Sequence, residues 1–117
     1  MSGFKGNIEK MTKRNNNYRK VVYTTKNLQL VLMSLKPREE IGMEKHPRTT
    51  QFIRIEQGKG VAIIGKRKYN LSDGSALIIP PNKRHNIINT GKNKLSLYTL
   101  YSPPEHQKNR IERNKQL

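Results

Sequence analysis

The sequence predicts an all-β protein, an antiparallel barrel or jelly roll. Hydrophobic residues make up only 32% of the 117 residues, but they gather in short alternating runs instead of being diluted evenly. Such runs are typical of strands around a filled interior. Turn residues such as Asp73-Gly74 and Pro80-Pro81-Asn82 separate them. Because no long helical pattern lies in the centre of the chain, short strands at this spacing favour a rolled-up antiparallel sheet.

The expected strands follow one another with short connections. In chain order they cover residues 19–25, 28–35, 44–46, 51–57, 61–64, 68–71, 75–79, 85–89 and 95–101. Pro37 presets the bend after the second of them. Residues 61–64 should pair back on 51–57 through the turn Gly58-Lys59-Gly60, and Asp73-Gly74 should close a tight turn.

One domain is expected, since a chain of this length supports one modest core. Residues 1–18 form a polar, basic segment that should fray or wrap the edge of the barrel, and the barrel itself covers residues 19–106. Residues 107–117 are a charged tail. From Pro103 onward the chain has enough charge, and few enough apolar residues, to be mobile or only locally ordered.

Composition excludes several classes of protein. The chain has no cysteine, so disulfides and thiolate zinc sites are excluded and any metal site must use nitrogen and oxygen donors. No apolar run approaches the roughly 18 to 20 residues that span a bilayer, and residues 1–20 lack the apolar centre of a signal peptide. We therefore expect a soluble intracellular protein without membrane insertion.

The chain is strongly basic. Its 24 lysines and arginines against 8 acids give a net charge of +16, and this charge is spread over the barrel as well as the ends. Such a potential attracts polyanions, phosphorylated metabolites or anionic surfaces in a salt-dependent way. The alternative is compositional drift, because abundant Asn and Lys are the bias expected of an AT-rich coding sequence.

Four metal-donor side chains stand where one cavity could collect them. Glu44 and His46 are two residues apart, so on an extended strand both face inward while Lys45 points to solvent. Gln51 opens the next alternating run, and His85 follows the apolar stretch before the 80–82 turn. A lone strand histidine is more often a packed or surface residue, but the four together predict a divalent metal site.

The spacing of these residues resembles the two motifs of the cupin superfamily of small metal-binding barrels. The first motif corresponds to Glu44-x-His46, four residues, Gln51, six residues and Gly58. In the second, the matching positions are Gly74, Pro80, His85 and Asn89, with Asn82 where the family prefers glycine. The resemblance covers residues 19–106 and implies a double-stranded β-helix, the jelly-roll barrel of a short single-domain cupin.

The resemblance also implies one divalent metal, Mn, Fe, Ni, Co or Zn, held by Glu44, His46, Gln51 and His85, with open positions for water or substrate. Here Glu44 replaces the usual first histidine of the family and Gln51 the usual glutamate. Sugar-phosphate isomerases of the cupin class use the same four donor types, with the acid and the amide placed the other way round.

Further residues are candidates for binding a substrate. The expected ligands are flanked by three basic residues, Arg48, Lys83 and Arg84, which could bind a phosphate or carboxylate. The alternative is that they are solvent-exposed loop residues without a binding role. Tyr98 could position a polar ligand from the last strand, although strand tyrosines usually pack. Glu44 could move a proton if the metal does not fully occupy it.

Three hypotheses of function remain open at this point. The first is a metal-dependent enzyme of the isomerase or epimerase type, acting on a small polar or anionic substrate such as a sugar phosphate. The second is a non-catalytic basic module that binds nucleic acid or another polyanion without sequence preference or assists assembly, for example inside a virion. The third is an iron-dependent oxygenase. Outward-facing Phe52, Arg54 and Ile88 also predict a homodimer formed by contact between sheets.

Overall fold

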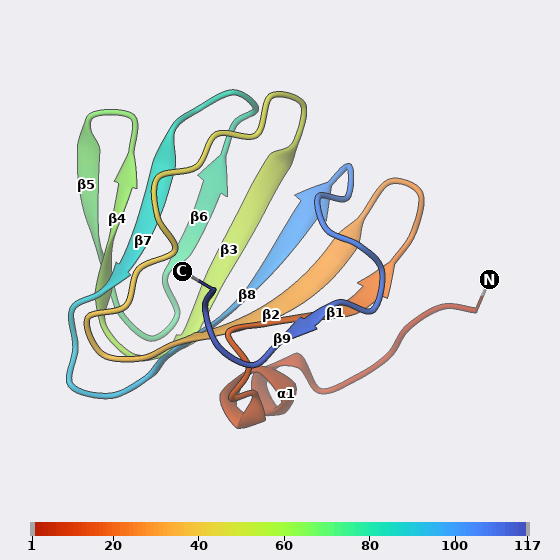
Figure 1. Ribbon diagram of the computed structural model, residues 1–117, viewed down its shortest axis with the longest axis horizontal. Coiled ribbons are helices and arrows are strands. Elements are labelled where there is room, and N and C mark those ends of the chain that lie inside the picture. The colour runs from red at the N-terminus through yellow and green to blue at the C-terminus, as the bar shows by residue number, and fades with distance from the viewer. Residues whose placement is uncertain (1, 117) are drawn as a thin grey trace.

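The fold is built from two antiparallel sheets that face each other. The structure is a computed structural model and describes residues 2–116. A large sheet has the strand order β6-β3-β8-β2-β1-β9, and a small sheet has the order β5-β4-β7. Figure 1 shows the small sheet beside the large one, with the connection between β2 and β3 passing in front. The predicted all-β class, a jelly-roll barrel of the double-stranded β-helix type, is confirmed.

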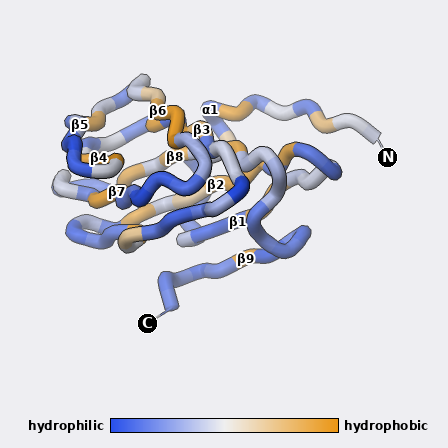
Figure 2. The backbone as a smooth tube through the Cα atoms, turned by 90° about the horizontal axis from the view of Figure 1, so that it is seen from above, coloured by the Kyte–Doolittle hydropathy of each residue, from blue (hydrophilic) through white to orange (hydrophobic). Residues whose placement is uncertain are grey.

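The strands match the expected runs closely. Their bounds are β1 Arg19–Thr24, β2 Gln29–Leu35, β3 Thr50–Gln57, β4 Gly60–Ile64, β5 Arg67–Leu71, β6 Ala76–Ile79, β7 His85–Asn89, β8 Leu95–Ser102 and β9 Ile111–Glu112. In Figure 2 hydrophobic colour follows the strands in the middle of the molecule, whereas the segment leading to the C-terminus is blue.

The interior changes from apolar to polar along the strands. Alternate residues of β2, β3 and β8 face inward, and their buried apolar members are Val31, Met33, Leu35, Ile53, Ile55, Leu95 and Leu97. At the other end of the same strands, Gln29, Tyr101 and Gln51 form one cross-strand row and are all buried. Since residues opposite each other in an antiparallel pair share a face, this row places polar groups inside the barrel.

Two expected elements differ from the structure. Residues 44–46 do not form a strand: Glu44 makes only an isolated antiparallel bridge with His85. Residues 60–64 do not pair back on β3 either, because β4 crosses to the small sheet and pairs with β5 and β7. Gly58 allows this crossing, since its φ is +114° and a Cβ there would lie 2.9 Å from the carbonyl oxygen of Lys94.

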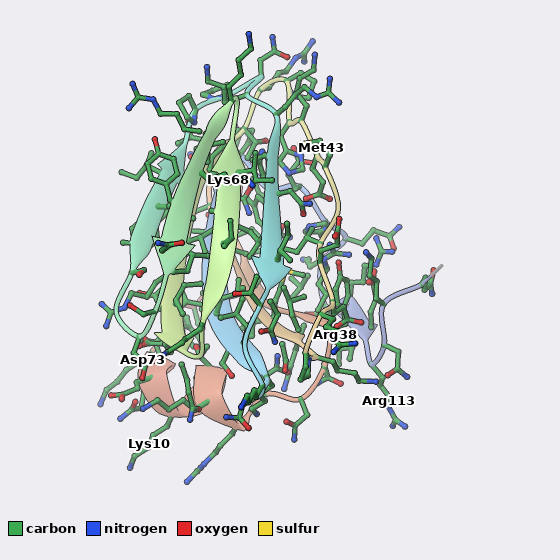
Figure 3. All side chains as sticks on the ribbon, turned by 90° about the vertical axis from the view of Figure 1, so that its left-hand side faces the viewer. Lys10, Arg38, Met43, Lys68, Asp73 and Arg113 are labelled. Carbon is green, nitrogen blue, oxygen red and sulfur yellow. The ribbon has the colours of Figure 1, made fainter. Side chains whose placement is uncertain are left out.

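Both ends of the chain add to the barrel. Helix α1, Ile8–Arg14, is capped by Asn7 and packs against β2, β3 and β8, so the N-terminal segment contains a helix that the sequence pattern did not predict. Figure 3 shows this helix, with Lys10 labelled, across the lower end of the sheets. The C-terminal strand β9 pairs with β1. The large sheet therefore extends beyond the boundary expected at residue 106.

Candidate metal centre

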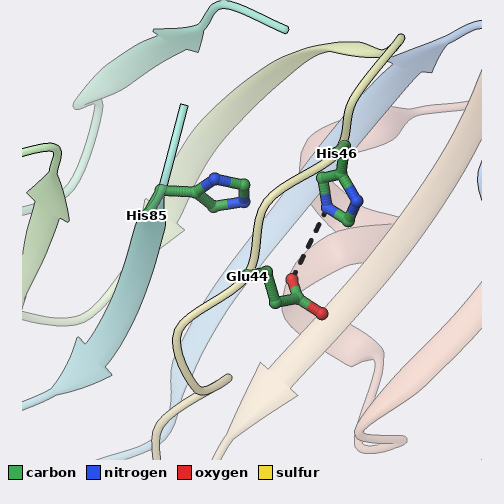
Figure 4. Close-up of side chains that lie close together, drawn as sticks. All are labelled: Glu44, His46 and His85. Carbon is green, nitrogen blue, oxygen red and sulfur yellow. Dashed lines mark ion pairs between the residues drawn. The ribbon is translucent and has the colours of Figure 1, made fainter. Parts of the chain in front are cut away.

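Glu44, His46 and His85 bring their donor atoms together inside the barrel. One donor atom from each lies within 4.8 Å of the others, and Figure 4 shows the three side chains converging from β7 and from the segment before β3. Two backbone hydrogen bonds between Glu44 and His85 fix this approach, with N to O distances of 2.8 and 2.9 Å. The predicted inward orientation of Glu44 and His46 is therefore reached without a regular strand.

His85 presents a free nitrogen to this cluster. Its Nδ1 lies 2.8 Å from the carbonyl oxygen of Lys83, an acceptor, so Nδ1 carries the proton. The other nitrogen, Nε2, is buried and has no hydrogen-bond partner among residues 2–116. A metal-binding histidine usually donates its second ring N–H to a carbonyl or carboxylate in this way. The local backbone thus sets His85 in the tautomer that a metal ligand needs.

His46 lies between two carboxylates. Its Nε2 is 3.7 Å from Glu44 Oε1 and its Nδ1 is 3.3 Å from Glu105 Oε2. The Glu44 carboxylate raises the pKa of His46 above its ordinary value, against the effect of burial. Burial works to raise the pKa of Glu44, but His46 and the more distant Arg19 outweigh it and hold that pKa below its usual range. A metal at Nε2 would compete with this proton.

Glu105 was not identified from the sequence. It follows β8 in the segment expected to be mobile, and its Oε1 accepts a 2.7 Å hydrogen bond from the Thr49 hydroxyl. That bond holds the carboxylate beside His46 Nδ1, as in the carboxylate–histidine pairs that orient metal ligands. The only sequence signal for Glu105 is its position shortly after β8, at an end of the barrel.

Gln51 lies on β3 and faces the interior. Its Nε2 donates a 3.0 Å hydrogen bond to the Thr99 hydroxyl, and its Oε1 is buried without a partner in the part of the chain that the structure describes. The side chain opposite it in register belongs to Tyr101, whose ring meets the His46 ring edge-on at 5.9 Å. Gln51 therefore offers an amide oxygen on the wall that His46 approaches.

The third histidine of the chain lies outside this cluster. His106 lies in the segment expected to be mobile, but it is half-buried and its ring packs against Tyr101 with a centroid distance of 5.1 Å. Gln29 holds the segment, donating to the carbonyl of His106 at 2.8 Å and accepting from its N–H at 3.0 Å. Burial lowers the pKa of His106 to about 4, so it is neutral at physiological pH.

Of the four residues expected to bind a substrate, the three basic ones are at the surface and Tyr98 faces away from the cluster. Arg48, Lys83 and Arg84 are exposed, and Lys83 and Arg84 line one hollow together with Lys45. Tyr98 is not brought to the cavity, because it lies on the opposite face of β8 from Tyr101. It packs on the outside of the large sheet, with its ring 6.2 Å from that of Phe52.

Comparison with known proteins decides the family. The cupin domain family matches residues 31–101, which is more than half of the chain and includes Glu44, His46, Gln51 and His85. This chain is a cupin.

Similar cupins occur in bacteria and in a virus. YrkC of Bacillus subtilis is 46% identical over 106 residues, and L612 of Acanthamoeba polyphaga mimivirus is 44% identical over 110. These matches cover 86% and 91% of this cupin. They cover 57% of YrkC and 69% of L612, so this chain spans little more than half the length of the bacterial relative.

The crystal structure of BH2720 from Bacillus halodurans has nearly the same fold. It superposes with a TM-score of 0.93 at 38% identity, covering 96% of this cupin and 89% of that chain. Within residues 2–116, this cupin has no helix long and apolar enough to cross a membrane.

Proposed function

We propose that this cupin holds one divalent metal ion through Glu44, His46, Gln51 and His85 and acts as a metal-dependent enzyme. One observation carries the proposal: His46 Nε2, His85 Nε2 and Gln51 Oε1 are all buried without hydrogen-bond partners among residues 2–116. A buried polar atom that lacks a partner costs about 1–3 kcal/mol. Two of these atoms belong to histidines grouped with the Glu44 carboxylate, and such a set fits a cation far better than it fits an apolar core.

The chemistry follows from the donor set. When bound, the metal would polarise a carbonyl or hydroxyl oxygen of the substrate. With two imidazoles, an amide and a carboxylate as ligands, a metal that accepts more than four donors would keep positions for water or substrate. Glu44 is the partly exposed member, with 31% of its side chain accessible. Its lowered pKa keeps the carboxylate ionised, so Glu44 would be the group that accepts a proton from a bound substrate.

The expected substrate is small and polar or anionic, such as a sugar phosphate, with isomerase or epimerase chemistry. The positive charge around the outside of the site supports this choice. Arg48, Lys83 and Arg84 are exposed near the segments that carry His46 and His85, and they would attract an anionic substrate towards the metal.

Turnover of a panel of sugars and sugar phosphates tests this function. We expect isomerisation or epimerisation of at least one compound by protein loaded with Mn, Fe, Ni, Co or Zn, and none by metal-free protein. Glu44→Gln should lower the rate by about 10²-fold or more, as expected for loss of a general base. Oxygen consumption by the ferrous form without isomerisation would replace this proposal with the oxygenase alternative.

A homodimer is also proposed, through the outer face of the large sheet. Leu30, Leu100, Phe52 and Ile78 stand in one register row across four strands on this face. Ile78 is 69% exposed, and an apolar row of this kind marks an association surface.

Light scattering at moderate salt should give a mass of about twice 13.6 kDa. Ile78→Asp should shift the protein to the monomer, because it would bury a charge in the interface. The matched control is Leu28→Asp at an exposed turn residue, which should leave the mass unchanged. A monomeric wild-type protein would contradict the proposal.

A further inference from the structure

We propose that a basic groove at the end of the small sheet binds the backbone of a single-stranded nucleic acid. Two hollows, of 680 and 460 Å³, adjoin here and share Gly65, Lys66 and Lys83. The larger is also lined by Arg67 and Tyr69. The basic groove is defined by its five cations, Lys45, Lys66, Arg67, Lys83 and Arg84.

The loops that carry these cations are joined by backbone hydrogen bonds. Gly65 N donates to the carbonyl of Arg84 at 2.8 Å, and Asn82 N donates to the carbonyl of His46 at 2.7 Å. The Lys83 side chain also lies against Gly65, 3.6 Å from where a Cβ would stand. The cations are therefore presented by one connected frame rather than by separate flexible loops.

The residues that the structure describes do not neutralise the charge of the groove. Neither hollow has an acidic residue in its lining. Across residues 2–116, none of the five side chains makes an ion pair or a hydrogen bond. Lys94, by contrast, is bonded to the carbonyl of Lys13. Figure 3 shows side chains with blue nitrogen ends gathered at this end of the molecule, beyond Met43. Such uncompensated charge attracts phosphates.

Exposed apolar side chains lie beside the cations. Tyr69 on β5 is 40% exposed and lines the larger hollow, which is bounded on the β6 side by Ile78, at the end of the row proposed for the dimer contact. These strands are edge strands of the two sheets, so the hollow lies where the sheets meet. An aromatic ring next to a row of cations suits unpaired bases, which stack on the ring while their phosphates contact lysine and arginine. A duplex would not offer its base faces.

Fluorescence anisotropy with labelled dT12 and rU12 at several salt concentrations tests the proposal on the full chain. The groove variant is Lys66→Glu, Lys83→Glu and Arg84→Glu together. The matched control is Lys10→Glu, Lys26→Glu and Lys108→Glu, which makes the same change of net charge at exposed positions elsewhere. We expect the groove variant to bind at least about thirtyfold more weakly, with its salt slope reduced by about 2. The control should change affinity by less than about threefold.

Variants of Tyr69 provide a second test, because they change base stacking without changing the charge of the groove. Tyr69→Ala should weaken oligonucleotide binding about tenfold without changing the salt slope, and Tyr69→Phe should restore it. Inorganic polyphosphate, which has no bases, should bind both variants equally. Thermal unfolding at the wild-type midpoint would show that each variant is folded.

Three results would overturn the proposal. Equal losses in the groove variant and the control would mean that the whole charge, and not this groove, attracts nucleic acid. Failure of both dT12 and rU12 to bind at low salt would exclude a nucleic-acid partner. Groove-dependent binding to vesicles of anionic lipid without oligonucleotide binding would assign the surface to a membrane. Because none of these measurements involves the metal, they are independent of the proposed enzymatic function.

Discussion

Replacing His46 and His85 with alanine should remove the metal from a protein that we expect to be purified with about one divalent ion per chain. Both histidines belong to the group whose donor atoms lie within 4.8 Å of one another, so the double variant keeps only Glu44 and Gln51 of the four proposed ligands. Elemental analysis after extensive dialysis measures the ratio directly. Full metal occupancy in the double variant would rule out this site.

The third histidine supplies the matched control. His106→Ala removes a half-buried imidazole that does not belong to the cluster, and it should leave the metal in place. Glu105→Gln should have an intermediate effect. It keeps the shape of the side chain but removes the charge 3.3 Å from His46 Nδ1, and loss of such an outer partner weakens metal binding about 10- to 100-fold.

Metal removal should also destabilise the wild-type barrel. Glu44, Gln51 and His85 come from separate segments of the chain, and an ion that binds only the folded form stabilises it. At a free metal concentration a thousandfold above the dissociation constant, the free energy of unfolding should rise by about 4 kcal/mol. The double histidine variant should show no such dependence on metal, as measured by thermal unfolding with and without chelator.

The inner faces of the strands were predictable because side chains alternate along a strand. The period of two placed Ile53 and Ile55 in the core together with Gln51, and the structure has all three buried. Glu44 and His46 reach the cluster as their two-residue spacing predicted, although the backbone there forms only an isolated bridge and not the expected strand. Residue spacing within short segments was therefore sufficient to predict most of the metal-donor cluster.

Contacts that depend on how the chain ends return to the barrel were not predictable. Glu105 and His106 lie in a polar segment whose composition indicates mobility. Gln29 on β2 and Thr49 just before β3 nevertheless fix this segment through side-chain hydrogen bonds. Likewise, β4 crosses to the other sheet after Gly58, a residue that packs so closely against Leu95 that a side chain there would clash. Contacts of this kind join residues that are far apart in the sequence, so no local sequence pattern predicts them.

The C-terminal strand is held by a buried ion pair that was not expected from the sequence. Arg19 Nη1 contacts both carboxylate oxygens of Glu112, at 3.1 and 3.0 Å, and the two residues lie 93 positions apart. The accessible fractions of the two side chains are only 10% and 7%. Arg110, at the surface, adds a second contact to Glu112 at 2.6 Å. The pair joins β9 to β1 at the edge of the large sheet.

Glu112→Leu should therefore lower the free energy of unfolding by about 3 kcal/mol or more, because it leaves the Arg19 guanidinium buried without a counter-charge. Arg19 Nε already lacks a partner among residues 2–116, and loss of Glu112 would leave Nη1 without its carboxylate as well. The double variant Arg19→Met with Glu112→Leu should recover most of this loss, since apolar side chains of similar size can replace a buried pair at little cost. Urea unfolding of metal-free protein measures Glu112→Leu, Arg19→Met and the double variant, and the three values together give the coupling between the two residues. Glu9→Gln, which breaks the exposed Lys13 pair on α1, is the control and should leave the urea midpoint unchanged. If Glu112→Leu were as mild as Glu9→Gln, the ion pair would not be what holds the C-terminal strand on the barrel.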